Sequence, residues 1–243
     1  NVDSDDNGHG TGIASVAAAQ GNNQIGMSGM AWNVEVMPIK ALSGVGVGNT
    51  REVVLGIRYA IERGANIILM SIGSTTASTL LEQTINDAWK AGILTVAAAG
   101  NDGAVGSSLL YPAQFEHTLS VAATFSNDVR APFSNFGSSL DVVAPGVDIT
   151  HATDEGGYTT SSGTSFAAPF VAGTAALLKS RHPGLRPEQL LAVIRDSADT
   201  VAGMNGADRT DQYGSGRLNA AAALRSISGD AAAVLVSKTE NIP

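Results

Sequence analysis

The sequence predicts an α/β fold in which helices cover both faces of a mostly parallel central sheet. Short apolar, β-branched segments alternate with longer segments whose apolar residues recur at i, i+3 and i+4. The short segments are apolar nearly throughout, which is typical of parallel strands that are buried on both faces. Glycine accounts for 28 of the 243 residues, so the elements can pack closely and connect through tight turns.

The strands and helices follow in order along the chain. Buried strands are predicted over 33–42, 65–73, 92–100, 117–124 and 140–146. Helical spacing predicts helices over 50–64 and 78–92, and each of these ends at a glycine. The C-terminal third is more helical, with predicted helices over 164–183, 186–199 and 216–227; Pro187 suits the first turn of the second of these.

Composition excludes several classes of protein. The net charge of −8 argues against a nucleic-acid-binding surface, which requires clustered Lys and Arg. The absence of cysteine removes disulfides and thiol chemistry. No membrane span is predicted, because the sequence has no apolar run of about 18 residues. No phosphate-binding glycine pattern follows a strand, and no GxSxG nucleophile motif is present. The length fits one large domain, with or without a short tail.

Three glycine-bracketed motifs interrupt the apolar pattern where a strand gives way to a helix or loop. They are GHGTG around His9, AAAGNDG around Asn101 and SSGTSFAAP around Ser165. Each residue alone is more simply explained as a capping or turn residue. Together they supply a base, a neutral amide donor and a hydroxyl nucleophile, which is the set that acyl transfer requires. Spacing alone does not show that the three converge, although ligands of α/β sheets bind at the carboxyl ends of strands.

The order of these motifs resembles the subtilisin-like serine proteases. The resemblance is carried by GHGTGIASVAAA, TVAAAGNDG and GTSFAAPFVAGTAALL, with MSIG (70–73) and LDVVAPG (140–146) as further landmarks. It implies a three-layer subtilisin-like fold, a peptidase domain over 1–228, and a linker or the start of a further segment over 229–243. It also implies that Ser165 is the nucleophile, that His9 is the general base, and that the Asn101 amide and the Ser165 N–H form the oxyanion hole. Catalysis would need no cofactor.

The resemblance also implies how a peptide or protein substrate binds. Residues of two segments would wall the pocket for the residue before the scissile bond: Ser71, Ile72 and Gly73, and Ala98, Ala99 and Gly100. Gly46, Val47 and Gly48 would pair with an extended substrate by strand addition, although the glycines equally fit a flexible loop. Leu110 would shorten the pocket, or Asp102 at its rim would favour basic side chains. Tyr111–Pro112 matches a family position where the proline is commonly cis.

The chain departs from the family before His9. The family's catalytic Asp lies well upstream of the histidine, whereas Asp3, Asp5 and Asp6 share the loop that leads into it and are expected to be solvated or part of a cation site. Three explanations are open: the missing strand is a separate chain after self-cleavage or is otherwise present in the protein, it is missing from the sequence as given, or the protein never had this Asp. The intact Ser, His and Asn motifs favour the first two explanations; an inactive fold that serves as a binding or scaffold module is the alternative. Two smaller departures are Gly12, where many relatives have His, and Phe166, where Met is common.

A calcium site and the cellular setting are further expectations from the resemblance. The segment 20–29 resembles a calcium-binding loop, in which Asn23 would donate its side-chain oxygen and Ile25 and Met27 their carbonyls. The remaining ligands would come from the upstream part, and a plain Asn/Gly-rich turn explains the segment equally well. The upstream segment or a propeptide is an expected partner. The expected location is extracellular or in the cell envelope.

Overall fold

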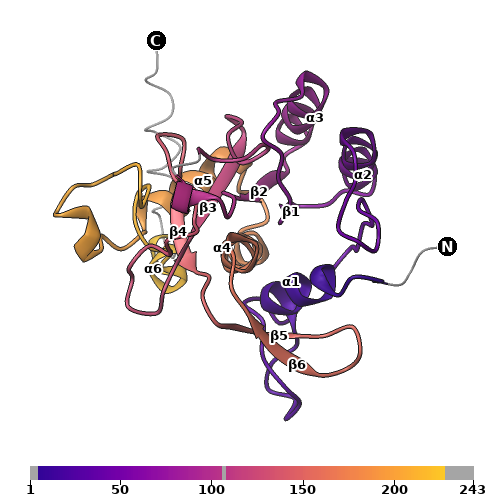
Figure 1. The fold of residues 1–243 in the computed structure, drawn as a ribbon, viewed down its shortest axis with the longest axis horizontal. Helices are drawn as coiled ribbons and strands as arrows, with labels where there is room; N and C mark the ends of the chain where they lie inside the picture. Colours follow the sequence, from indigo (N-terminus) through magenta and orange to yellow (C-terminus); the bar gives the residue numbers. More distant parts are fainter. Residues whose placement is uncertain (1–4, 106–107, 228–243) are drawn as a thin grey trace.

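The computed structural model describes residues 5–105 and 108–227 (Figure 1). In chain order, the elements are α1 (His9–Ala18), α2 (Thr50–Glu62), β1 (Ile67–Met70), α3 (Thr79–Lys90), β2 (Leu94–Ala98), the 3-10 turn η1 (Gly103–Val105), β3 (Thr118–Thr124), β4 (Val142–Pro145), β5 (Ile149–Ala152), β6 (Tyr158–Ser161), α4 (Thr164–Arg181), α5 (Pro187–Asp196), the 3-10 turn η2 (Ala202–Met204) and α6 (Ala220–Ser226). Residues 229–243, the predicted linker or further segment, lie outside the described part of the chain.

Four of the five predicted strands form one parallel sheet in the order β1-β2-β3-β4. Ile67 of β1 pairs with Leu94 of β2, and Val121 of β3 pairs with Val142 of β4. Every residue of β2 and β3 is buried, as expected for strands covered on both faces. The predicted α/β class with a parallel sheet is therefore confirmed.

Alternate residues of the strands pack into two separate cores. Leu94 and Val96 face the core that α4, α5 and α6 share with the sheet. Ala97 and Ala99 face the other core, to which α2 and α3 contribute. Helices therefore cover both faces of the sheet, which gives the three layers (Figure 1).

The predicted helices are present, with shifts at their ends. The cap of α2 is Asn49, whose side chain accepts hydrogen bonds from the N–H groups of Arg51 and Glu52. The helix predicted over 216–227 begins only at Ala220. The backbone of Arg217 exchanges hydrogen bonds with Asp199, and this pairing keeps the chain extended before the cap residue Asn219.

The strand predicted over 33–42 is wrong for the described structure. This segment has no strand partner among the described residues, and Val36, Met37 and Ile39 are 52%, 39% and 38% exposed. A strand forms only where a neighbour satisfies its backbone groups. β1 lies at one edge of the sheet, and its apolar residues from Ile67 to Leu69 are only half-buried.

The sequence did not predict the antiparallel hairpin β5–β6. In this hairpin His151 pairs with Thr159, and the hairpin lies against α1 (Figure 1). The Tyr111–Pro112 peptide bond is cis, as the resemblance implied. Within the described ranges, no helix is both long and apolar enough to cross a membrane.

Candidate active site

Ser165 is the second residue of α4 and lies beside the carboxyl end of β1. Its Oγ is 3.4 Å from the carbonyl oxygen of Ser71, and the Ser71 hydroxyl donates to the Ser165 carbonyl at 2.8 Å. Ser71 directly follows β1. The first N–H groups of a helix have no intrahelical partners, and the helix dipole favours negative charge there. Ser165 therefore stands where an anionic intermediate would be stabilised.

Asn101 follows β2, and its side chain is oriented by Thr164. Its Oδ1 accepts hydrogen bonds from the Thr164 N–H at 2.9 Å and from the Thr164 hydroxyl at 3.0 Å. Because these donors meet Oδ1, the Nδ2 group is left to donate elsewhere. A Cβ atom built on Gly163 would lie 3.5 Å from Asn101 Nδ2 and 3.7 Å from the Ser165 nitrogen. Two donors thus border one small space beside Ser165, which is the arrangement of an oxyanion hole.

His9 is the first residue of α1, and its half-buried ring reaches the start of α4. It meets the Phe166 ring edge-on, with ring centroids 6.1 Å apart. Burial lowers the pKa of His9; the Asp5 carboxylate opposes this shift and His151 adds to it. The ring is therefore kept in the neutral form that can accept a proton. No hydrogen bond links His9 to Ser165 or to a carboxylate among the described residues, and such bonds often tighten only when substrate binds.

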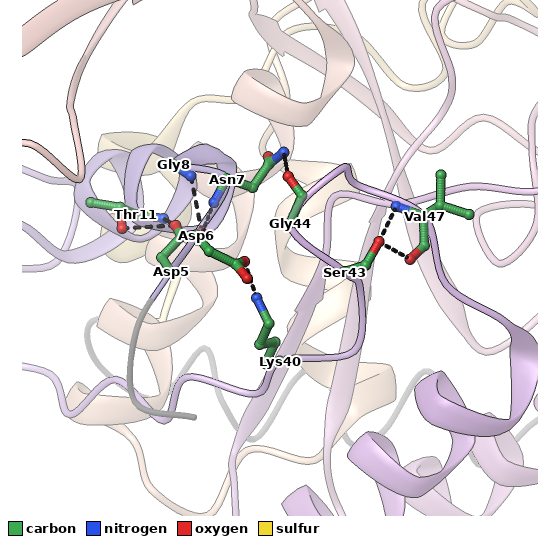
Figure 2. Close-up of polar contacts among 9 residues, drawn as sticks. All are labelled: Asp5, Asp6, Asn7, Gly8, Thr11, Lys40, Ser43, Gly44 and Val47. Carbon is green, nitrogen blue, oxygen red and sulfur yellow. Dashed lines mark hydrogen bonds and ion pairs between the residues drawn. The ribbon is translucent and has the colours of Figure 1, made fainter. Parts of the chain in front are cut away.

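Asp5 caps the first turn of α1 and is thus more than a solvated loop residue, while its part in a cation site stays a prediction. One carboxylate oxygen accepts from the N–H groups of Asn7 and Gly8 at 3.1 and 3.0 Å (Figure 2). The other accepts from the N–H and hydroxyl of Thr11 at 2.7 and 2.8 Å. Partial burial opposes the effect, but these hydrogen bonds lower the pKa of Asp5 to about 2. Asp5 thereby fixes the backbone on both sides of His9.

The chain also matches known proteins over most of its length. The Subtilase family model matches residues 1–216. The chain belongs to the subtilase family. It is 40% identical over 222 residues to alkaline elastase YaB of Bacillus sp. (strain YaB), an alignment that covers 91% of this chain and 56% of the relative. It is 39% identical over 221 residues to subtilisin Savinase of Lederbergia lenta, covering 91% of this chain and 79% of the relative.

A third relative is the thermophilic serine proteinase of Bacillus sp. (strain AK1). It is 42% identical over 197 residues, which cover 81% of this chain and 48% of that protein. The chain thus spans about half the length of several relatives that it matches.

The expected substrate-pairing loop of this subtilase is closed on itself. The Ser43 hydroxyl donates to the Val47 carbonyl at 2.8 Å and accepts from the Val47 N–H at 3.4 Å (Figure 2). The Ser43 N–H also donates to the Val47 carbonyl, at 2.9 Å. The loop is tied to the residues before His9, because Lys40 pairs with Asp6 and Asn7 donates to the Gly44 carbonyl at 2.8 Å. Substrate pairing at 46–48 therefore stays a prediction that requires Val47 to exchange these partners.

The two expected pocket walls lie on neighbouring strands. Ser71, Ile72 and Gly73 follow β1, which pairs with β2; Ala98 is the last residue of β2, and Ala99 and Gly100 follow it. Leu110 bridges the walls: a Cβ on Gly73 would lie 2.6 Å from its Cδ1 and one on Gly100 would lie 2.7 Å from its Cγ. This position fits the expectation that Leu110 shortens the pocket. Asp102 is exposed, with its N–H bound to the Asn135 side chain at 2.6 Å.

The expected calcium loop supplies an incomplete oxygen set. Asn23 Oδ1 accepts from the Ile25 N–H at 3.1 Å and so closes a local turn. With the carbonyls of Ile25 and Met27, the segment offers three donors, whereas calcium takes about six to eight. No cluster of three or more His, Cys, Asp or Glu that could hold a metal occurs in the described part of the chain. Calcium would therefore need further ligands from outside this segment.

Two residues beside the site were missed from the sequence. An Asp shortly before a helix start is a recognisable capping signal, so the capping role of Asp5 could have been predicted from the sequence. His151 carries no such signal, because it comes from the unpredicted hairpin and meets α1 only in the folded protein.

The cap at Asp5 makes an acid-sensitive contribution to stability. Replacing Asp5 by Asn should lower the free energy of unfolding by about 1–2 kcal/mol at pH 7, because one acceptor oxygen becomes an NH2 group that faces hydrogen-bond donors. The folded pKa of about 2 lies below the ordinary value of 3.8, so this contribution is present above pH 4 and declines as the pH falls toward 2. Denaturant unfolding at pH 7 and pH 3 measures it, with Asp6→Asn as the exposed control. Equal stabilities of Asp5→Asn and the native protein at pH 7 would contradict it.

Proposed function

We propose that this protein is a serine endopeptidase in which Ser165 attacks the peptide carbonyl and His9 takes its proton. The Asn101 side chain and the Ser165 N–H would stabilise the oxyanion. The main support is the convergence of these two donors beside the Ser165 hydroxyl, at the carboxyl ends of β1 and β2. The printed names of the relatives, an alkaline elastase and a serine proteinase, are those of peptidases and so favour peptide or protein substrates.

We further propose that the catalytic Asp lies in a segment upstream of the described residues. Both oxygens of Asp5 are engaged by the first turn of α1, so Asp5 has no oxygen left over to orient His9. A strand added at the open edge of β1 would cover Ile67–Leu69 and offer 33–42 a partner. That segment, or a propeptide, is thus the expected partner of this chain, in a protein located outside the cell or in the cell envelope.

Labelling with a fluorophosphonate, a reagent for activated serines, tests the function directly. The full-length protein should be modified at Ser165, and Ser165→Ala should remove the label because it removes the proposed nucleophile. Ser162→Ala is the matched control, since that hydroxyl accepts only the Asp148 N–H at 2.9 Å and should leave labelling intact. Absence of labelling in the full-length protein would instead favour an inactive subtilase that binds or scaffolds.

We propose a structural calcium ion at the 20–29 loop, completed by upstream ligands. Calcium should then raise the melting temperature relative to chelator, because a ligand that binds only the folded state stabilises it by about 2.7 kcal/mol at 100 times its Kd. Asn23→Ala should reduce this shift, whereas Asn22→Ala, one residue earlier, should not. Identical melting in calcium and in chelator would remove the site.

A further inference from the structure

We propose that His151 is a positioning residue for His9. It acts through the Phe166 ring and through its close approach to Gly12 of α1. This inference rests on the proposed function, in which His9 is the general base. His151 lies on β5, is 7% exposed, and is far from His9 in the sequence.

The Phe166 ring contacts both histidines. His151 stacks on it with ring centroids 4.6 Å apart and an interplanar angle of 26°. His9 meets the same ring edge-on at 6.1 Å and 74°. Phe166 is itself 7% exposed and directly follows Ser165. A displacement of His151 would therefore be passed to the ring that adjoins both the base and the nucleophile.

Both nitrogens of His151 are engaged, so its ring cannot turn freely. Nδ1 lies 2.9 Å from the Ala152 carbonyl oxygen, and Nε2 lies 2.9 Å from the Ser161 hydroxyl. A carbonyl oxygen only accepts, so Nδ1 carries a hydrogen; in the neutral ring Nε2 then accepts from Ser161. The hairpin thus holds the imidazole in one orientation.

The hairpin also contacts α1 on both sides of His9. A Cβ on Gly12 would lie 2.7 Å from His151 Nδ1, and one on Gly8 would lie 2.7 Å from an Asp154 oxygen. Ser15 links the two elements, because its hydroxyl donates to the Gly12 carbonyl at 2.7 Å and accepts from the Ala152 N–H at 3.0 Å. Figure 1 shows β5 and β6 lying along α1. The backbone that carries His9 is therefore braced by the hairpin that carries His151.

The contact has an electrostatic consequence at His9. Burial lowers the pKa of His9, Asp5 opposes that shift, and His151 adds to it. Asp154 is a further charged residue of the hairpin, and its carboxylate lies close to Gly8, which precedes His9. Removing the His151 ring would both admit water and remove its contribution to this shift. The pKa of His9 should then rise toward its ordinary value.

The first test compares His151→Ala with His117→Ala in the full-length protein. His117 is a matched control: it stacks on Trp89 at 4.7 Å and its Nδ1 lies 2.6 Å from Asn86 Oδ1, both on α3. We expect His151→Ala to raise the pKa of His9 measured by NMR. It should also lower kcat per titrated site about 10-fold with little change in KM, since a small misplacement of a catalytic group is costly. His151→Phe, which keeps the stacking ring, should recover most of kcat.

A second test measures the contact itself through unfolding. Gly12→Ala should destabilise the native protein, because the new methyl group meets His151. In the His151→Ala background the same change should be harmless or stabilising, because alanine favours helix more than glycine does. Equal effects in both backgrounds would overturn the proposed contact.

The outcomes separate this inference from the proposed function. A native protein that is neither labelled nor able to hydrolyse peptides would refute the proposed protease function. The His9 pKa and the unfolding measurements on Gly12→Ala in the two backgrounds would still decide the role of His151. A His151→Ala protein that is only less stable, with an unchanged His9 pKa and unchanged kcat, would reduce His151 to a packing residue and overturn the inference.

Discussion

Replacing His9 by alanine should reduce turnover by about 10⁶-fold, the size known for the triad histidine of subtilisin itself. His9 is the only described histidine that lies at the start of α1 against α4, and its loss would leave the Ser165 hydroxyl without a base. The measurement is kcat/KM on a peptide substrate with the full-length protein. His182→Ala, at the far end of α4, should leave kcat/KM unchanged. A His9→Ala enzyme that keeps more than about one hundredth of the activity would contradict the assignment, because even a single oxyanion donor contributes that much.

The acid limb of the activity profile provides a second view of the same group. Burial lowers the pKa of His9 among the described residues, whereas the catalytic Asp proposed upstream would raise it by favouring the charged ring. The acid limb therefore reports the balance of these two effects on the base. Asp5→Asn should move the limb to still lower pH, because the Asp5 charge opposes the shift. An acid limb that Asp5→Asn leaves unmoved would show that the Asp5 charge does not act on His9 in the native enzyme.

The sequence predicted those parts of the fold that depend on local pattern. Continuous apolar runs identified β1 to β4 because helices pack on both faces of the sheet and cover the side chains of these strands. The same pattern predicted a strand wrongly at 33–42. An apolar run is not sufficient for a strand, because a partner strand is also required, and this segment has none among the described residues. The polar residues of β6 gave no such signal, so the hairpin that supports α1 was missed.

The site divides in the same way. Motifs identified His9, Asn101 and Ser165, but spacing could not place them together. The adjacency of β1 and β2 and the packing of α1 against α4 bring the elements that carry them together. The orientation of Asn101 by Thr164 and the close approach of His151 to Gly12 arise only from tertiary contacts. Sequence therefore named the candidate reacting groups, while the contacts that orient them required the structure.

Replacing Asn101 by aspartate should lower kcat by at least about 10²–10³-fold, the loss known for the corresponding subtilisin donor, with little change in KM. The substitution isolates the donor, because a carboxylate oxygen can still accept from the Thr164 N–H and hydroxyl at the positions where Asn101 Oδ1 now does. What changes is Nδ2, which borders the space beside Gly163 and would become an acceptor that repels the oxyanion.

Steady-state kinetics beside unfolding measurements distinguish loss of the donor from loss of structure. Asn127→Ala, which removes only a local turn contact to the Val129 N–H at 3.2 Å, is the matched control and should keep full kcat. Gly163→Ala probes the same space sterically, since its methyl group would lie 3.5 Å from Nδ2 and 3.7 Å from the Ser165 nitrogen and so occupy the place of the oxyanion. If Asn101→Asp and Gly163→Ala both fold stably and keep native kcat, the oxyanion does not bind between these two donors, and the proposed attack geometry at Ser165 is wrong.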